Sequence, residues 1–593
     1  MARTVGDFLF ERLHQWGVKR VFGYPGDGIN GIVAALGRAG ERADDAIEFV
    51  QVRHEEEAAF MACGHAKFTG EVGVCLATSG PGAIHLLNGL YDAKLDHQPV
   101  VAIVGQSVRS ALGGHFQQEV DLASLFKDVA GEFVQICTSP EQARHLIDRA
   151  LRIAKAQRCV TAIIFPNDVQ EAPAIDAPAH MHGTIHSGVD FTRPQVMPAE
   201  KDLQRAADIL NEGEKIAILV GAGAAGAAAE VQEVAERLHA GVAKALLGKA
   251  VLPDDLPFVT GQIGLLGTKA SYALMNECDT LLMIGSTFPY SEFLPREGQA
   301  RGVQIDIDPR MLSLRYPMEA ALEGDAVLTL RGLLPRLKSR ANGPWRQTVE
   351  RNARDWWEEE GERAHLPADP LNPELFYWEL SSRLPDHAIV AVDTGMSTTF
   401  FARALRLRSG MRMAVSGTLA TMGPAISYAT AAKFAYPRRP AFALVGDGAM
   451  QMMGINALIT AAKYWRQWED PRLIVAVLNN GDLNMVSWEL RALGGSPKVP
   501  ETQDVPNFDY AGYAELLGLT GLRIAGPDDV VPVLERALAA RMPVVIDVRA
   551  DPNVIALPPH TTFEQTKKFF EALAKGDVDR MAILRQIYQQ VSA

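Results

Sequence analysis

Clustered basic residues are missing from this 593-residue sequence, which argues against a nucleic-acid surface. The formal net charge of −13 also disfavours attachment to anionic membranes. Five cysteines are scattered without a C-x-x-C pair, so neither a zinc site nor a disulfide framework is indicated. No apolar run approaches the roughly 20 residues that span a bilayer. We therefore expect a cytoplasmic protein with no transmembrane segment and no nucleic-acid partner.

Valine- and isoleucine-rich runs alternate with helical patterns in three blocks, the rhythm of buried parallel sheets. The blocks cover residues 1–180, 195–340 and 365–550, and the first and third share no strong sequence repeat. We expect an α/β protein with three tandem doubly wound parallel-sheet domains. Residues 551–593 are expected to form a tail whose helical part packs on the body.

The most specific motif is LVGDGAM at 444–450 followed by VLNNGD at 477–482, each half after a predicted strand. Gly446 and Gly448 allow a turn whose N–H groups face a diphosphate. The side chains of Asp447 and Asn480, with the Asp482 carbonyl, offer the hard oxygen ligands that suit Mg²⁺. A lone GDG is usually just a turn, but the pair predicts a metal–diphosphate site.

This pair of motifs resembles the signature of the thiamine-diphosphate enzymes of the acetolactate synthase, pyruvate oxidase and pyruvate decarboxylase superfamily. VRHEEEAAFMACGHAKFTG at 52–70 resembles the glutamate helix of that superfamily, which implies that Glu55 is the carboxylate beside the aminopyrimidine ring. Such a carboxylate favours the imino tautomer, whose nitrogen removes the thiazolium C2 proton. The alternative is that HEEE is only a solvated helix start, and Glu56 and Glu57 receive no role.

The same resemblance assigns further residues to this site. Leu419 would hold the cofactor bent, Gln118 would be the substrate-facing amide and Phe116 a pocket wall, although Gln117 could exchange roles with Gln118. Glu489 is either near the reacting carbons or an ordinary helix-surface carboxylate. The residues assigned to thiamine diphosphate are Tyr24, Pro25, Gly26, Gly395, Gly417, Thr418, Leu419, Gly446, Asp447, Gly448, Ala449, Asn480, Asp482, Leu483, Asn484 and Met485.

The middle block resembles a flavin domain. A lone G-x-G-x-x-G in VGAGAAGAAAE at 220–230 is compatible with NAD, FAD or a mere helix start, but the ordered set of segments resembles the FAD domain of quinone-dependent pyruvate dehydrogenases (pyruvate oxidases). Leu247 departs from that pattern, which usually has arginine, and Met485 stands where the quinone branch has an aromatic residue. The residues assigned to FAD are Arg158, Gly221, Gly223, Gly264, Leu265, Leu266, Gly285, Ser286, Thr287, Phe288, Asp306 and Asp325.

The resemblance implies decarboxylation of a 2-keto acid, with pyruvate as the first choice, and oxidation of the resulting enamine by FAD. Electrons would pass to a quinone or O₂, and peripheral membrane contact is left open. It also implies a homodimer or homotetramer in which Glu55 acts across a subunit interface.

The alternatives are an acetolactate synthase-like carboligase, or a non-oxidative decarboxylase, with FAD structural or absent. An NAD-dependent dehydrogenase leaves GDG…NN unexplained, and a noncatalytic nucleotide-binding subunit leaves Glu55 and Leu419 without a purpose.

Overall fold

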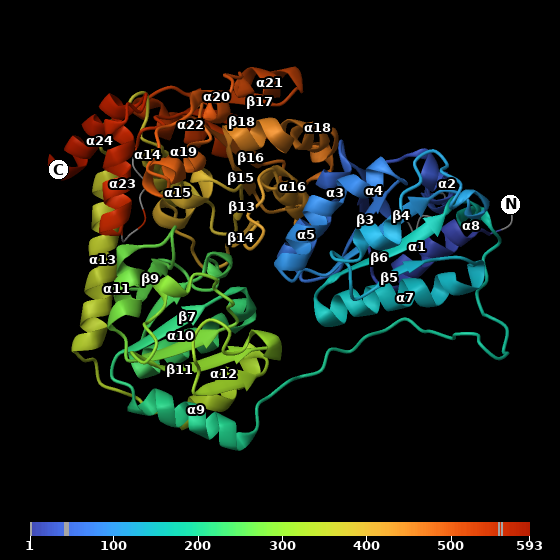
Figure 1. Cartoon of the computed structure of the whole chain (residues 1–593), viewed down its shortest axis with the longest axis horizontal. Helices are drawn as coiled ribbons and strands as arrows, with labels where there is room; N and C mark the ends of the chain where they lie inside the picture. Colours follow the sequence, from blue (N-terminus) through green and yellow to red (C-terminus); the bar gives the residue numbers. More distant parts are fainter. Residues whose placement is uncertain (1–2, 41–46, 555–557, 559–560, 593) are drawn as a thin grey trace.

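The computed structural model describes residues 3–40, 47–554, 558 and 561–592. Three six-stranded sheets follow one another along the chain, and every strand pairing within them is parallel. Helices cover the sheets (Figure 1). The predicted class, three tandem parallel-sheet α/β domains, is confirmed.

The first sheet has the order β2-β1-β3-β4-β6-β5. Its central strands are buried along their whole length, because helices cover both faces. The strands are β1 (Arg20–Gly23), β2 (Glu48–Gln51), β3 (Gly73–Ala77), β4 (Val100–Gln106), β5 (Val134–Ile136) and β6 (Val160–Pro166). The helices are α1 (Val5–Gln15), α2 (Asn30–Gly40), α3 (Glu55–Thr69), α4 (Pro81–His85), α5 (Leu87–Leu95), α6 (Leu122–Phe126), α7 (Pro140–Gln157) and α8 (Asn167–Glu171).

The central sheet has the order β12-β11-β10-β7-β8-β9. Counted from its own first strand, this is the 3-2-1-4-5-6 order of dinucleotide-binding domains, in which β7 and β10 flank the point where the order reverses. The strands are β7 (Ile216–Val220), β8 (Gly241–Lys244), β9 (Val259–Gln262), β10 (Thr280–Ile284), β11 (Arg301–Asp306) and β12 (Ala320–Glu323). The helices are α9 (Glu200–Glu212), α10 (Ala228–Leu238), α11 (Lys269–Glu277), α12 (Ala326–Leu333) and the long α13 (Pro344–Ala364).

The third sheet has the order β14-β13-β15-β16-β18-β17, which repeats the topology of the first. The turn after β15 continues into a π-helical turn, Met450–Gly454, a feature frequent at functional sites. The strands are β13 (Ile389–Val392), β14 (Arg412–Val415), β15 (Ala441–Gly446), β16 (Leu473–Asn479), β17 (Thr520–Ile524) and β18 (Val544–Arg549). The helices are α14 (Pro373–Arg383), α15 (Met396–Ala404), α16 (Ala425–Ala435), α17 (Asp447–Ala449), α18 (Ile455–Tyr464), α19 (Asn484–Ala492), α20 (Pro500–Gln503), α21 (Tyr510–Leu516) and α22 (Val530–Leu538).

The first and third domains pack directly on each other, although the central domain lies between them in sequence. Residues 172–199, all within the described part of the chain, contain no helix or strand and run as a long strap to the central domain (Figure 1). Helix α3 packs against α16, and one continuous core includes Phe60, Tyr428 and Met450. In the tail, α23 (Phe563–Ala574) packs on α19 and is followed by α24 (Arg580–Ser592).

Candidate active site

Glu55 begins α3, just after β2 at the carboxyl edge of the first sheet. His54 is the N-cap residue of this helix, and its Nδ1 atom accepts a hydrogen bond from Glu56 N at 3.2 Å. A carboxylate at this position is stabilised by the partial positive charge of the helix start. Glu55 is only 8% exposed, so the acid predicted from the sequence is a buried one.

The two oxygens of the Glu55 carboxyl group have different surroundings. Oε2 lies 2.9 Å from Nδ1 of His85, the last residue of α4. A Cβ atom at Gly82 would lie 3.0 Å from Oε1, so glycine leaves room for the carboxyl group beside the start of α4. The loop of residues 24–28 packs against the same segment, because Gly28 N donates a hydrogen bond to Thr78 Oγ1 at 3.0 Å. The predicted residues 24–26 therefore lie at this edge of the sheet.

The structure separates the three residues considered for the substrate pocket. The Ser79 hydroxyl donates a hydrogen bond to Gln118 Oε1 at 3.3 Å, which ties Gln118 to the loop that leads to Gly82. Gln117 is exposed, and Phe116 is 56% exposed in the same loop. Within one chain, Gln118 reaches the region of Glu55, whereas Phe116 faces solvent.

Asp447 and Asn480 meet because they follow neighbouring parallel strands, β15 and β16. Asp447 Oδ2 accepts hydrogen bonds from Asn480 N at 2.9 Å and from Gly481 N at 2.7 Å. Burial raises the pKa of Asp447 to about 6, and the other groups that act most strongly on it are backbone N–H groups and the Asp482 carboxylate. None of these is a cation, so the donor set fits a bound divalent cation that would stabilise the charged carboxylate.

The Asp482 side chain is occupied within the protein. Its Oδ1 accepts a hydrogen bond from the Ser487 hydroxyl at 2.8 Å, and its Oδ2 accepts one from Asn484 Nδ2 at 2.9 Å. Lys498 Nζ lies 3.1 Å from Oδ1. Both side-chain oxygens of Asp482 thus have partners within the protein, and the role of its backbone carbonyl as a metal ligand stays a prediction.

Helix α19 begins beside the turn at Asp447. A Cβ atom at Gly448 would lie 2.6 Å from Leu483 Cδ2, which places Leu483 and Ala449 at the same turn. Met485 packs at the edge of the third-domain core. Glu489 is exposed on the same helix, which leaves both readings of this residue open.

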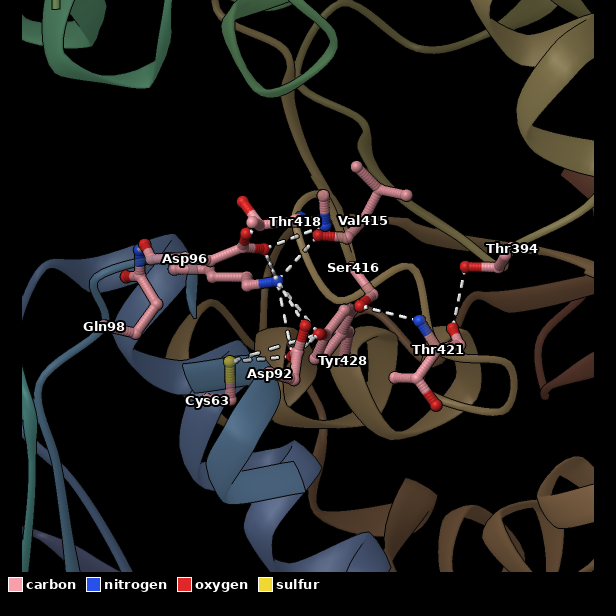
Figure 2. A network of polar contacts seen from close by, with 12 residues as sticks. Cys63, Asp92, Asp96, Gln98, Thr394, Val415, Ser416, Thr418, Thr421 and Tyr428 are labelled. Carbon is pink, nitrogen blue, oxygen red and sulfur yellow. Dashed lines mark hydrogen bonds and ion pairs between the residues drawn. The ribbon is translucent and has the colours of Figure 1, made fainter. Parts of the chain in front are cut away.

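The segment of residues 415–418 is held by the first domain (Figure 2). Lys67 Nζ donates hydrogen bonds to Val415 O at 2.6 Å and to Asp96 Oδ2 at 2.8 Å. The Asp96 carboxylate accepts Gly417 N at 2.9 Å and Thr418 N at 2.8 Å. Burial alone would raise the pKa of Asp96, but the Lys67 ammonium and these N–H groups lower it. We assigned Gly417 and Thr418 to the cofactor, and the structure shows that their N–H groups bind Asp96 of the first domain.

Met422 is a residue that the sequence reasoning missed. A Cβ atom at Gly448 would lie 3.3 Å from Met422 Cε, so this side chain reaches the turn at Asp447. Leu419, to which we assigned the role of bending the cofactor, is half-buried. The backbone turns between the two, with a φ of 53° at Ala420. The Met-Gly pair at 422–423 was the available signal, because Gly423 has a φ of 102°.

The start of α15 is a second part of the candidate site, of which the sequence analysis predicted Gly395 but missed Ser397. Gly395 precedes this helix with a φ of 110°. The hydroxyl of buried Ser397 lies 3.9 Å from the position of a Cβ atom at Gly446. A buried hydroxyl on the first turn of a helix, facing the diphosphate turn, fits an anion. The signal was the run of hydroxyl residues after a strand-end glycine.

Asn88 links the first domain to the third within one chain. Asn88 Nδ2 donates hydrogen bonds to Glu56 Oε1 at 2.6 Å and to Thr421 Oγ1 at 3.0 Å. Thr421 precedes Met422, which reaches the turn at Asp447. These contacts connect the start of α3 with the segment that leads to the predicted metal–diphosphate turn.

In the central domain, two glycine loops meet where the strand order reverses. Gly221 and Gly223 follow β7, and Gly285 follows β10 with a φ of 54°. Gly223 N donates a hydrogen bond to Gly285 O at 3.0 Å, and a Cβ atom at Gly223 would lie 2.7 Å from Gly285 Cα. In folds with this strand order, dinucleotides bind at the point where the order reverses. The close backbone approach fits a nucleotide cofactor.

The other predicted flavin residues occupy the same carboxyl edge. Residues 264–266 follow β9, residues 286–288 follow β10, and Asp306 ends β11. Asp306 is buried, which raises its pKa. Asp325 caps α12 by accepting a hydrogen bond from Leu328 N at 3.1 Å, a structural role that accounts for it without a ligand.

Arg158 and Leu247 lie at contacts between parts of the chain. Arg158 ends α7 in the left-handed region, and its Nη2 donates a long hydrogen bond to Gln98 Oε1 at 3.4 Å. Burial lowers its pKa, and so does Arg193 in the strap. Leu247 touches the third domain, because a Cβ atom at Gly417 would lie 2.6 Å from Leu247 Cδ1. Leu247 thus packs between domains.

Sequence-family models match each of the three domains. Residues 3–125 match "Thiamine pyrophosphate enzyme, N-terminal TPP binding domain", residues 203–333 match the central domain of these enzymes and residues 393–548 match their "C-terminal TPP binding domain". The chain belongs to the family of thiamine pyrophosphate enzymes and is a thiamine-diphosphate-dependent enzyme.

Individual relatives extend over nearly the whole chain. The protein YdaP of Bacillus subtilis (strain 168), whose name describes a thiamine pyrophosphate-containing protein, is 35% identical over 97% of this chain and 96% of its own length. Pyruvate oxidase of Lactiplantibacillus plantarum is 30% identical over 91% of this chain and 88% of its own. Acetolactate synthase isozyme 2 large subunit of Escherichia coli (strain K12) is 31% identical over 92% and 95%.

Among the helices that the structure describes, none combines the length and the apolar character needed to cross a membrane.

Proposed function

We propose that this enzyme decarboxylates a 2-keto acid, with pyruvate as the first substrate to test, and that FAD in the central domain takes up two electrons. The acceptor after FAD would be a quinone or O₂. The observation that carries the flavin part is the close contact of Gly223 and Gly285 after β7 and β10, where the strand order reverses. The likeness to pyruvate oxidase over most of the chain supports the same reading.

Mg²⁺ is proposed at Asp447, Asn480 and the Asp482 carbonyl, because a buried carboxylate whose pKa is raised has no cation among its main neighbours. Gly446, Gly448 and the Ser397 hydroxyl would bind the diphosphate. Thiamine diphosphate, once bound, supplies the carbon nucleophile and the electron sink for decarboxylation.

Glu55 would face the aminopyrimidine through Oε1, since Oε2 is engaged by His85. Gln118 would orient the keto acid, and Met422, rather than Leu419, would lie against the cofactor. These side chains bind and orient the reactants and hold one proton at the Glu55 carboxyl group.

An acetolactate synthase-like carboligase is the second candidate. Two observations favour it. The likeness to the acetolactate synthase subunit is as extensive as that to pyruvate oxidase. Leu247 stands where the oxidase pattern usually has arginine, and it packs against Gly417 at the domain contact. In this case FAD would be structural.

An anaerobic spectrum of the purified protein separates the two. Bleaching of a bound flavin on addition of pyruvate supports the oxidase, whereas formation of acetolactate with no bleaching supports the carboligase. A protein that binds no flavin from excess FAD would exclude the oxidase.

Asp447→Ala should abolish thiamine diphosphate binding in calorimetry while circular dichroism stays unchanged. Undiminished affinity would remove the metal assignment.

A further inference from the structure

His85 connects the buried Glu55 carboxyl group to the outside of the chain. Its Nδ1 lies 2.9 Å from Glu55 Oε2. The side chain of Glu55 is 10% exposed, whereas that of His85 is 42% exposed. The imidazole of His85 therefore contacts the buried acid through Nδ1, and part of the same side chain is exposed to solvent.

The orientation of the His85 ring is fixed by a second histidine. The rings of His54 and His85 stack with their centroids 4.4 Å apart and their planes 28° from parallel. His54 is itself held, because its Nδ1 accepts the hydrogen bond from Glu56 N at the start of α3. The stacking restrains the His85 ring, whose Nδ1 contacts Glu55 and whose side chain remains 42% exposed.

We propose that His85 is a proton-relay residue that exchanges protons between Glu55 and solvent. This inference rests on the proposed role of Glu55. When Oε1 gives its proton to the ring nitrogen of the cofactor, Oε2 receives the Nδ1 proton of His85 and Nε2 takes one proton from water. One proton enters from solvent and one leaves from Glu55, so the number of protons on the pair is unchanged. The reverse sequence returns the proton. Because neutral imidazole can donate at one nitrogen and accept at the other, histidine suits this task.

The variants His85→Asn and His85→Ala separate relay from orientation. The amide nitrogen of Asn can occupy the place of Nδ1 and still donate to Glu55, but it cannot pass a proton on. In the holoenzyme we expect both variants to slow C2–H/D exchange of bound thiamine diphosphate by about tenfold or more, below the ~10²–10⁴ of a direct acid or base. Added imidazole should restore exchange in His85→Ala. His365→Asn, at an exposed histidine at the end of α13, controls for loss of any imidazole. Exchange at the wild-type rate in His85→Asn would overturn the relay.

Glu55→Gln measured in parallel distinguishes this inference from the proposed function. If Glu55→Gln exchanges at the wild-type rate, the role of Glu55 itself is wrong. If Glu55→Gln is slow and both His85 variants are fast, only the relay fails. In the cofactor-free protein, the ¹⁵N signal of His85 Nδ1 should shift in Glu55→Gln, and an unchanged signal would contradict the contact.

His54, Glu55 and His85 also place one ligand atom each within 4.8 Å of one another. Tight Zn²⁺ binding that is lost in His85→Asn would therefore replace the relay with a metal site.

Discussion

The adjacent glutamates at 55–57 have three different environments. Glu55 contacts His85, and Glu56 contacts Asn88. Glu57 is fully buried, and its Oε2 accepts hydrogen bonds from Arg53 N at 2.9 Å and from the Thr460 hydroxyl at 3.0 Å. The sequence identified this helix start and favoured Glu55. It could not assign Glu57, because the deciding partner lies 403 positions away in the chain.

Glu57 should make stability depend on pH. Burial raises its pKa from 4.5 to about 7. The folded protein then binds more protons than the unfolded chain between these values, so the stability from this residue falls as pH rises from about 4.5 to 7, by about 3 kcal/mol in all. Glu57→Gln cannot titrate, and its thermal midpoint should fall less between pH 5 and pH 8 than that of the wild type. Calorimetric scans at both pH values measure this, and equal falls in the two proteins would contradict it.

At the scale of elements, α3 and α5 hold the segment of residues 415–418 through Lys67 and Asp96. This contact is a buried ion pair that also satisfies two backbone N–H groups. Loss of this contact should therefore shift residues 417 and 418, which we assigned to the cofactor.

Asp96→Asn should loosen this segment. The variant removes the charge opposite Lys67 and turns one N–H acceptor into a donor. Breaking an isolated buried pair from one side costs about 3–5 kcal/mol. Lys67 keeps a second buried acid, Asp92, at 3.4 Å, so we expect a smaller cost, seen as a lower urea midpoint and weaker thiamine diphosphate binding. Asp128→Asn is the matched control, since Asp128 pairs with Lys94 on the surface at 3.0 Å and such pairs contribute about 1 kcal/mol or less. Equal midpoints in the two variants would show that the Lys67–Asp96 pair has no special role.

Substitutions in the GAGAAG segment can test whether the contact between the loops after β7 and β10 belongs to a flavin site. Gly223→Ala places a methyl group against the Gly285 backbone, whereas a Cβ atom at Gly226 meets no atom within 4 Å. We expect Gly223→Ala to lose bound flavin and to keep its affinity for thiamine diphosphate. Gly226→Ala should keep both. Flavin absorbance per chain after incubation with FAD measures the difference, and full flavin content in Gly223→Ala would place FAD elsewhere.

Elements and their order could be predicted from the sequence further than contacts could. Parallel strands that are buried on both faces have an unmistakable apolar pattern, and glycine turns at their ends identified the loops of the site. Strand order inside the central sheet could not be read, because it depends on which strands pair. Met422 was missed for a related reason: the left-handed turn at Ala420 decides which apolar side chain of this segment reaches Gly448.

At the scale of the whole molecule, the first and third domains share one core through α3 and α16. The resemblance to known enzymes implied that Glu55 serves the cofactor of a partner subunit. Within one chain, Asn88 links Glu56 at the start of α3 to Thr421 of the third domain. The predicted homodimer or homotetramer, and the subunit that supplies Glu55, are open to a direct experiment.

Co-expression of Glu55→Gln with Asp447→Ala decides which subunit supplies the acid. If the site forms across an interface, the mixed dimer has one site with both native residues, so activity should return to about a quarter of the wild-type value when chains mix at random. If the site forms within one chain, every site contains a defect and no activity returns. Each variant expressed alone provides the baseline, and mass spectrometry of intact assemblies verifies mixing.

The shared core also has a consequence for synthesis on the ribosome. The middle of helix α3, residues 58–64, is apolar and buried, and the helix that covers it, α16, emerges more than 350 residues later. At about 5–20 residues per second, the growing chain displays that apolar face for some tens of seconds, while the strap and the central domain are still being made. Chaperones that bind nascent chains should therefore associate with this protein at intermediate lengths and leave once α16 has cleared the exit tunnel.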